Sequence, residues 1–191
     1  MSGSIIRDNR VSGIYKCLKK ISEIIAPNGR IFFGTFPSEV RPEHVTKETL
    51  KLITEYASND NIIIGAQSGS QRVLDLCHRG HLVGDIYNAV ELTLKAGLHP
   101  NVDFIFGLPG ENKEDIKLTI EMMNDISQMG AMIHTHSFIP LPQTPFGKEQ
   151  TSIIDKDLQK MIKRMISKGI AFGDWKKQEE IAIKISKYYR R

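Results

Sequence analysis

Two histidines stand two residues apart in an apolar segment, and their side chains could contact a substrate or a metal. His134 and His136 belong to the predicted strand 132–138, so both imidazoles lie on the same face of that strand. They could contact a substrate inside a barrel, or they could hydrogen-bond and pack against helices. Two ligands without a nearby cysteine or carboxylate are a weak zinc signal, so we predict no metal ligand in this chain.

A carboxylate stands in a second apolar segment. Asp103 lies between Val102 and Phe104, and burying its charge without a partner is costly. It could contact a substrate or cofactor, or it could make a structural hydrogen bond inside a barrel. We group Asp103 with His134 and His136 as candidate substrate contacts, and we predict no catalytic residue.

A glycine turn follows that second segment. The stretch Asn101–Glu111 is a strand that ends in Gly107 and Gly110, and a helix is predicted to begin near Asn112. Glycine lets a backbone approach a ligand closely, and the first N–H groups of a helix are free donors. We therefore expect this turn to hold a ligand, with Glu111 acting as a charge at the start of the helix.

These candidates must be positioned by strands that alternate with helices. Strands are predicted over 30–35, 61–67, 102–106 and 132–138, and helices over 11–25, 45–56, 83–96 and 112–128, with final helices near 155–168 and 175–189. Such alternation predicts an α/β fold with a parallel sheet. Four strands do not close an eight-stranded barrel, so the sheet is either open and doubly wound or part of a barrel. Both options place ligands at the carboxyl ends of the strands.

Composition indicates a globular chain without a membrane segment. The 191 residues are 40% hydrophobic and 25% charged, with a net charge of +4. The late basic residues alternate with acidic ones, which is typical of solvated helix faces and does not indicate nucleic-acid binding. No apolar run approaches the roughly 18 residues that span a bilayer. Two cysteines, Cys17 and Cys77, fit a reducing cytoplasm.

Three stretches together resemble the later half of the catalytic domain of the radical S-adenosylmethionine (SAM) superfamily. They are Gly65–Ser70 with Arg79–His81, Asp103–Glu111, and Phe138–Pro145. The similarity is greatest to the branch of methylthiotransferases and cobalamin-associated Fe–S oxidoreductases. It implies a partial TIM-like (β/α) barrel fragment, with strands three to six of the barrel in residues 1–150 and a helical C-terminal extension in 151–191.

The resemblance also implies roles at the strand ends. The residues it assigns to SAM are Gln67 and Ser68 for the ribose and methionine part, Arg79 for the methionine carboxylate, and Ile105, Gly107, Gly110, Phe138, Ile139 and Pro140 for the adenine. These residue types suit the ligand, because adenine prefers an apolar slot with backbone hydrogen bonds and a carboxylate prefers a guanidinium.

The chain departs from the family at the iron–sulfur site. The superfamily binds a [4Fe–4S] cluster through Cys-x-x-x-Cys-x-x-Cys, and here Cys17 and Cys77 are the only cysteines. The segment that binds the SAM amino group is missing too. We therefore expect a fragment, inactive by itself, of an enzyme that cleaves SAM reductively to a 5′-deoxyadenosyl radical. That enzyme would act on a substrate that the sequence does not identify, and a cobalamin requirement is left open.

Two other functions remain open, and one physical consequence follows from truncation. The chain could be a non-catalytic binding module with a degenerate barrel, or a doubly wound nucleotide or phosphate binder. If the preceding strands are absent, the predicted strand 30–35 becomes an edge. Exposed edges and apolar patches favour self-association, so we predict a dimer or larger contact there.

Overall fold

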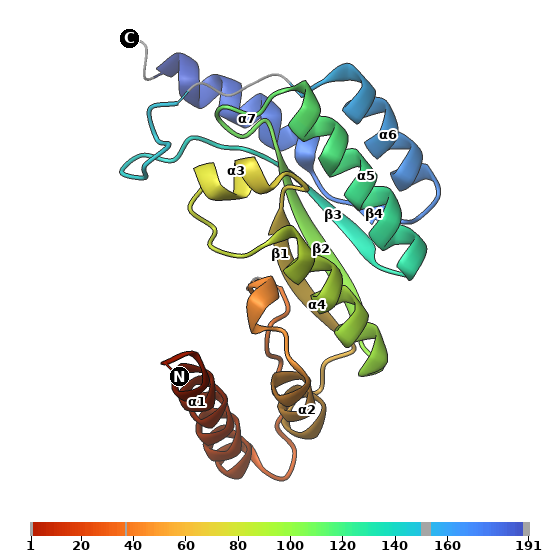
Figure 1. The fold of residues 1–191 in the computed structure, drawn as a ribbon. Coiled ribbons are helices and arrows are strands. Elements are labelled where there is room, and N and C mark those ends of the chain that lie inside the picture. Colours follow the sequence, from red (N-terminus) through yellow and green to blue (C-terminus); the bar gives the residue numbers. More distant parts are fainter. Residues whose placement is uncertain (1, 37, 150–153, 189–191) are drawn as a thin grey trace.

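Four parallel strands form one sheet in the computed structural model, which describes residues 2–36, 38–149 and 154–188 (Figure 1). They are β1 (Asn61–Gln67), β2 (His99–Phe106), β3 (Met132–Ser137) and β4 (Ala171–Phe172). The order in the sheet is β1-β2-β3-β4, and each neighbouring pair is parallel. Because the strands follow chain order without the reversal of a doubly wound sheet, the described sheet is an arc of the barrel type.

Most helices lie close to their predicted positions, although the first begins at Ser2 and not at Val11. The helices are α1 (Ser2–Ile25), the 3₁₀ helix η1 (Pro42–His44), α2 (Lys47–Tyr56), α3 (Gln71–Leu76), α4 (Val83–Lys95), α5 (Lys113–Met129), α6 (Lys156–Ser167) and α7 (Trp175–Tyr188). Local chemistry sets several ends. The Thr46 hydroxyl accepts the backbone N–H of Thr49 at 3.2 Å at the start of α2. Gly130 ends α5 in the left-handed conformation, with φ of 109°.

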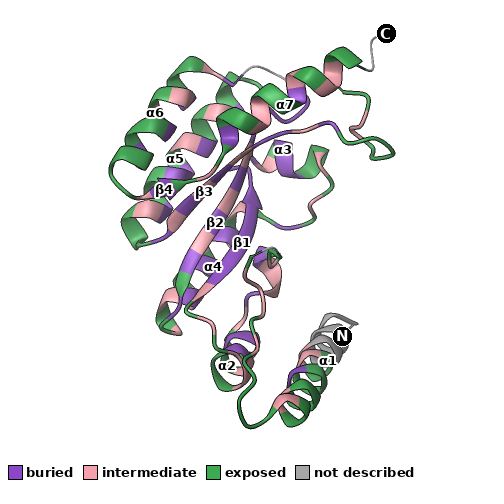
Figure 2. Ribbon diagram, turned by 180° about the vertical axis from the view of Figure 1, so that it is seen from behind, coloured by how far each residue is buried: buried purple, intermediate pink, exposed green. Residues whose placement is uncertain are grey.

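The central strands bury one face and leave the other partly open. Along β2 and β3 buried residues alternate with half-buried ones, as the two-residue period of a strand requires. The buried face carries Val102, Phe104, Phe106 and Ile133, each 0% exposed, and packs in one core with residues of α4, α5 and α6. The opposite face, seen in Figure 2, carries half-buried side chains. We call it the inner face, because it would line the barrel.

The prediction of a strand over residues 30–35 is wrong. Residues 30–35 run beside β1 without forming a strand, although the Gly34 carbonyl accepts the N–H of Ile63 at 2.9 Å. Gly34 has φ of 69°, which breaks the extended backbone. The Asn59 side chain accepts the N–H of Phe33 at 3.0 Å and donates to the Phe33 carbonyl at 2.7 Å. The side-chain amide thus makes the two hydrogen bonds that the backbone of a neighbouring strand would make.

Two features of the C-terminal part lie outside the prediction. The two-residue strand β4 was not predicted, and it extends the sheet beyond β3. The Ser137 hydroxyl donates to the carbonyl of Trp175 at 2.6 Å, which fixes the start of α7 against β3. The predicted division at residue 150 falls at residues 150–153, outside the described residues. Within the described part of the chain, every helix is too short or too polar to cross a bilayer.

Candidate functional site

The carboxyl end of β1 carries a charged cluster. Gln67 ends the strand with φ of 68°, after a register irregularity, and its Nε2 donates to Glu39 Oε2 at 2.8 Å. Arg79 Nη2 donates to the other carboxylate oxygen, Glu39 Oε1, at 3.0 Å. Glu39 thus holds Gln67 and Arg79 together, and it was not among the residues predicted from the sequence.

Gly65 is required by this cluster, which also contains unpaired buried atoms. A Cβ on Gly65 would lie 2.5 Å from Cδ of Glu39, so only glycine lets that carboxylate lie against the strand. Gln67 Oε1 and Arg79 Nε are buried with no hydrogen-bond partner among the described residues. Buried polar atoms are normally paired, so this pair of atoms points to a missing partner.

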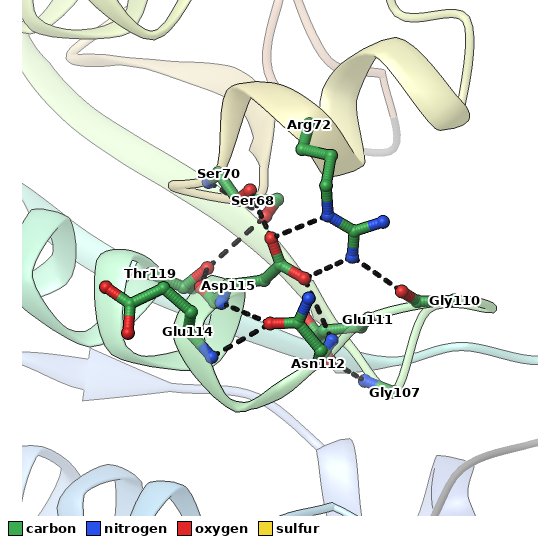
Figure 3. Close-up of polar contacts among 10 residues, drawn as sticks. All are labelled: Ser68, Ser70, Arg72, Gly107, Gly110, Glu111, Asn112, Glu114, Asp115 and Thr119. Atoms are coloured by element: carbon green, nitrogen blue, oxygen red, sulfur yellow. Dashed lines mark hydrogen bonds and ion pairs between the residues drawn. The ribbon is translucent and has the colours of Figure 1, made fainter.

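The Gly-x-x-Gly turn after β2 is tied to its neighbours at both glycines (Figure 3). Gly107 has φ of 74°, and its N–H donates to Glu111 Oε2 at 3.1 Å. Gly110 has φ of 78°, and its carbonyl accepts Arg72 Nη2 at 2.6 Å. Both residues adopt the left-handed backbone that glycine tolerates best. Burial raises the pKa of the Glu111 carboxyl to about 7.

Asp115 links three segments at the base of this turn. Its Oδ1 accepts the hydroxyl of Ser70 at 2.6 Å and Nε of Arg72 at 3.2 Å, and its Oδ2 accepts the N–H of Asn112 at 2.8 Å (Figure 3). Burial alone would raise the pKa of Asp115, but the hydrogen bonds from Arg72 and Ser70 outweigh it and lower that pKa. Sequence reasoning missed Arg72 and Asp115. The spacing from the Asn112 cap to Asp115, which forms a capping box, was the available signal.

The turn after Gln67 uses its polar groups internally. The Ser68 hydroxyl lies 3.3 Å from the hydroxyl of Thr119, which also accepts the N–H of Gly69 at 3.0 Å. The N–H of Ser70 donates to Ser68 Oγ at 3.1 Å. These contacts turn the Ser68 side chain toward α5, and they occupy the N–H groups that a bound phosphate would need.

An apolar cluster lies beside the glycine turn. Val73, Leu108 and Phe138 are buried together, and Ile105 and Phe146 pack against them. The N–H of Phe138 donates to the carbonyl of Phe106 at 2.9 Å, which keeps the chain after β3 next to β2. The next two predicted residues follow directly, with Ile139 half-buried and Pro140 buried. The adenine candidates are therefore neighbours in space.

Asp103, His134 and His136 meet on the inner face. His134 Nδ1 lies 2.9 Å from Asp103 Oδ1, and His136 Nε2 lies 3.7 Å from Asp103 Oδ2. Burial alone would raise the pKa of Asp103, but hydrogen bonds from the two histidines lower it. The prediction of no metal ligand assumed that no carboxylate was near the histidines, and that assumption is wrong. The cause is register: Asp103 pairs directly with His134 across β2 and β3.

A comparison with protein families decides the relationship. Residues 7–123, which make up more than half of the chain, match the model of the Radical SAM superfamily. The chain belongs to the radical SAM superfamily. The resemblance inferred from the sequence motifs is therefore confirmed.

Individual relatives of this radical SAM chain are longer proteins. It is 30% identical to an uncharacterised protein of Methanopyrus kandleri over 59% of this chain and 22% of that protein. It is 30% identical to the tRNA-2-methylthio-N(6)-dimethylallyladenosine synthase of Chlorobium chlorochromatii over 71% of this chain and 29% of that enzyme. The chain thus spans less than a third of the length of these relatives.

A solved structure shares the fold. Coproporphyrinogen III oxidase (HemN) from Escherichia coli, described as a radical SAM enzyme, aligns with a TM-score of 0.52 and 19% identity. The alignment covers 68% of this chain and 31% of that chain. This supports an α/β fold related to the TIM-like barrels of radical SAM enzymes.

The two cofactors of the family fit this chain differently. A [4Fe–4S] cluster needs thiolate ligands, and the only cysteines are Cys17 on α1 and Cys77 at the end of α3. The residues present therefore do not supply a cluster site. SAM fits better, because the strand ends offer unpaired buried atoms of Gln67 and Arg79 and, separately, an apolar cluster.

Proposed function

We propose that this radical SAM chain forms the part of an enzyme barrel that holds the nucleoside and methionine portions of SAM. The observation that carries the proposal is the pair of buried, unpartnered atoms, Gln67 Oε1 and Arg79 Nε, at the carboxyl end of β1. A ligand with an amino group and a carboxylate would satisfy both atoms. SAM has these groups at its methionine end.

Arg79 is the residue that would bind the methionine carboxylate. One nitrogen of its guanidinium is held by Glu39, which leaves Nε for a second anionic partner. Gln67 would accept from the ligand through Oε1, because its Nε2 already donates to Glu39. Ser68 would contribute only through its carbonyl, since its hydroxyl and its N–H are both bonded inside the fold.

The adenine would lie at the apolar side of the same rim. Ile105 and Phe138 supply apolar surface there, and Ile139 and Pro140 continue it. Gly107 and Gly110 adopt the left-handed backbone that glycine tolerates best, so the turn between them would present backbone groups to the adenine. Together these residues form an apolar wall beside the charged cluster.

For the whole protein we propose the family reaction, reductive cleavage of SAM, acting on a substrate that faces Asp103, His134 and His136. SAM supplies the reactive 5′-deoxyadenosyl group when it is bound beside a reduced cluster. This chain contributes binding and orientation only, because its two cysteines do not provide a cluster site. We therefore expect no 5′-deoxyadenosine from the 191-residue chain after incubation with iron, sulfide, dithionite and SAM.

Titration calorimetry of the 191-residue chain with SAM tests the proposed binding site. We expect weak, saturable binding that falls at least tenfold in Arg79→Ala and is not restored in Arg79→Lys, since lysine lacks the planar fork. Lys95→Ala is the matched control, because Lys95 is an exposed cation on α4 paired with Glu91. Folding of each variant is checked by circular dichroism. No binding of SAM by the folded chain, or equal binding by Arg79→Ala, would refute the proposal.

ATP and inorganic phosphate serve as comparison ligands. The strand order and the occupied N–H groups of the turn 68–70 argue against a phosphate site. Tighter binding of either ligand than of SAM would favour the nucleotide- or phosphate-binding alternative.

A further inference from the structure

We propose that Asp103, His134 and His136 bind a divalent first-row transition-metal ion on the inner face of the sheet. One potential ligand atom from each residue lies within 4.8 Å of the other two. The three side chains are 13%, 16% and 26% exposed, so they are largely shielded but still reached from the inner face. Two imidazoles and a carboxylate are a frequent ligand set for such ions.

The spacing of the ligand atoms suits a single ion. His134 Nδ1 lies 2.9 Å from Asp103 Oδ1 and 3.1 Å from His136 Nε2. Two atoms that each lie about 2.1 Å from one ion are separated by about 3.0 Å at octahedral angles and about 3.4 Å at tetrahedral angles. Only small side-chain shifts are therefore needed to bring all three atoms onto one ion.

The hydrogen bonds around this cluster point one nitrogen of each imidazole toward Asp103. Gln178 Nε2 lies 3.3 Å from His136 Nδ1, and the orientation of that amide is fixed because its Oε1 accepts the N–H of Ser137 at 2.8 Å. With Nδ1 as the acceptor, a neutral His136 carries its proton on Nε2. His134 must carry its proton on Nδ1 to donate to Asp103. Both N–H groups then face Asp103, at 2.9 Å from His134 and 3.7 Å from His136, and a cation that replaced the two protons would accept a lone pair from each ring.

Gln178, which lies next to Nδ1 of His136, should influence the metal affinity of the site. When Nε2 binds an ion, Nδ1 carries the proton and needs an acceptor. In the structure Gln178 turns its oxygen to Ser137 N–H and its nitrogen, which only donates, to His136 Nδ1. A glutamate at position 178 would offer one oxygen to each donor. Gln178→Glu should therefore tighten metal binding by about tenfold, because hydrogen-bond partners of a metal-binding histidine change metal affinity by at least this factor.

Other neighbours support an open coordination site. The His134 ring stacks on Phe172 of β4, with centroids 4.3 Å apart and planes at 10°, which fixes the ring orientation. Three protein ligands leave at least one coordination position for water or a donor atom of another molecule. That position would face the proposed substrate side, and only this last point rests on the proposed function.

Metal binding can be measured without SAM and without any activity. Metal-free 191-residue protein is titrated with Zn²⁺ by calorimetry and with Co²⁺ by visible absorption. We expect one equivalent of each ion, with Co²⁺ bands typical of nitrogen and oxygen ligands. His136→Ala and Asp103→Asn should each weaken Zn²⁺ binding at least tenfold. Asp103→Asn keeps an acceptor for His134, so it preserves the hydrogen bond while removing the charge.

The controls separate this site from other histidines and from the SAM proposal. His99→Ala is matched to His136→Ala, because His99 is exposed at the start of β2 and should leave binding unchanged. Folded protein that binds no Zn²⁺ would overturn the inference. So would equal affinity in wild type, His136→Ala and Asp103→Asn, or a failure of Gln178→Glu to tighten binding. Because SAM is titrated separately, loss of SAM binding with retained Zn²⁺ binding refutes only the proposed function.

Discussion

Arg72 and Asp115 join α3 to the first turn of α5 through two hydrogen bonds from one guanidinium to one carboxylate. The Asp115 side chain is 4% exposed, whereas that of Arg72 is 51% exposed. A buried carboxylate thus depends on a cation that reaches it from the surface. The same guanidinium donates to the carbonyl of Gly110, so the pair also fixes the glycine turn.

Removing the cation should therefore destabilise the fold. Arg72→Ala leaves Asp115 buried with only Ser70 and backbone donors, and we expect a loss of about 2 kcal/mol in the free energy of unfolding. Urea denaturation followed by circular dichroism measures it. Lys95→Ala removes an exposed pair with Glu91 and should change stability by less than about 0.5 kcal/mol. Equal losses in the two variants would contradict this account.

Glu111 should make stability depend on pH. The pKa of the folded state is raised to about 7 from an ordinary value of 4.5, so the stabilising contribution is complete below about pH 4.5 and is lost as the pH rises through 7. Between pH 5 and pH 8 the wild type should lose about 2 kcal/mol relative to Glu111→Gln, which keeps an acceptor for Gly107. Urea titrations of both proteins at several pH values provide the comparison. Parallel pH profiles would show that Glu111 does not titrate in this way.

Gly69 should not tolerate a side chain. A Cβ there would lie 2.6 Å from the carbonyl oxygen of Leu118 and 2.6 Å from Cα of Thr119, and backbone atoms of α5 cannot move aside easily. We expect Gly69→Ala to cost about 2 kcal/mol in thermal or urea unfolding. In Gly84→Ala the new Cβ meets nothing within 4 Å in α4, so this control should stabilise the protein by about 0.5 kcal/mol. A neutral Gly69→Ala would mean that the helix and turn are not packed this closely.

The segment before β1 should promote self-association. Phe32 is 55% exposed and Phe36 is 79% exposed, and both lie in the stretch that runs beside the sheet edge. We predict a reversible dimer that Phe32→Ser with Phe36→Ser weakens at least tenfold, measured by sedimentation equilibrium. A monomer at high protein concentration, or an equal dimer in the double variant, would argue against this contact.

Local chemistry made much of the fold predictable. The bounds of β1 were predicted correctly, because an apolar run buried on both faces leaves little freedom of assignment. Thr46 and Gly130 marked helix ends by their side-chain and backbone preferences. Residues 30–35 were assigned wrongly as a strand. Their composition favours a strand. In the folded chain, however, Phe33 hydrogen-bonds to the side-chain amide of Asn59, and Gly34 makes an isolated hydrogen bond to β1.

The site was less predictable than the fold. The glycine turn and the apolar strand ends carry local signals, and the structure places them side by side. By contrast, Glu39 meets Gln67 across 28 positions, and Asp103 meets His134 across 31. Sequence spacing does not predict such contacts, because they depend on the strand register and on the path of the loops. Sequence reasoning therefore identified Gln67, Asp103 and His134 as separate candidates, and it missed Glu39.

Because buried and half-buried side chains alternate along β2 and β3, each strand has one face in the core and one face that is partly open. Residues that hold the domain together point at α4, α5 and α6, and their neighbours in sequence point the other way. Exchanging Asn101, Asp103, Met132 or His136 would therefore change the chemistry of the inner face while the buried apolar face stays the same. A strand built this way can acquire new chemistry by single substitutions while its hydrophobic half stays constant.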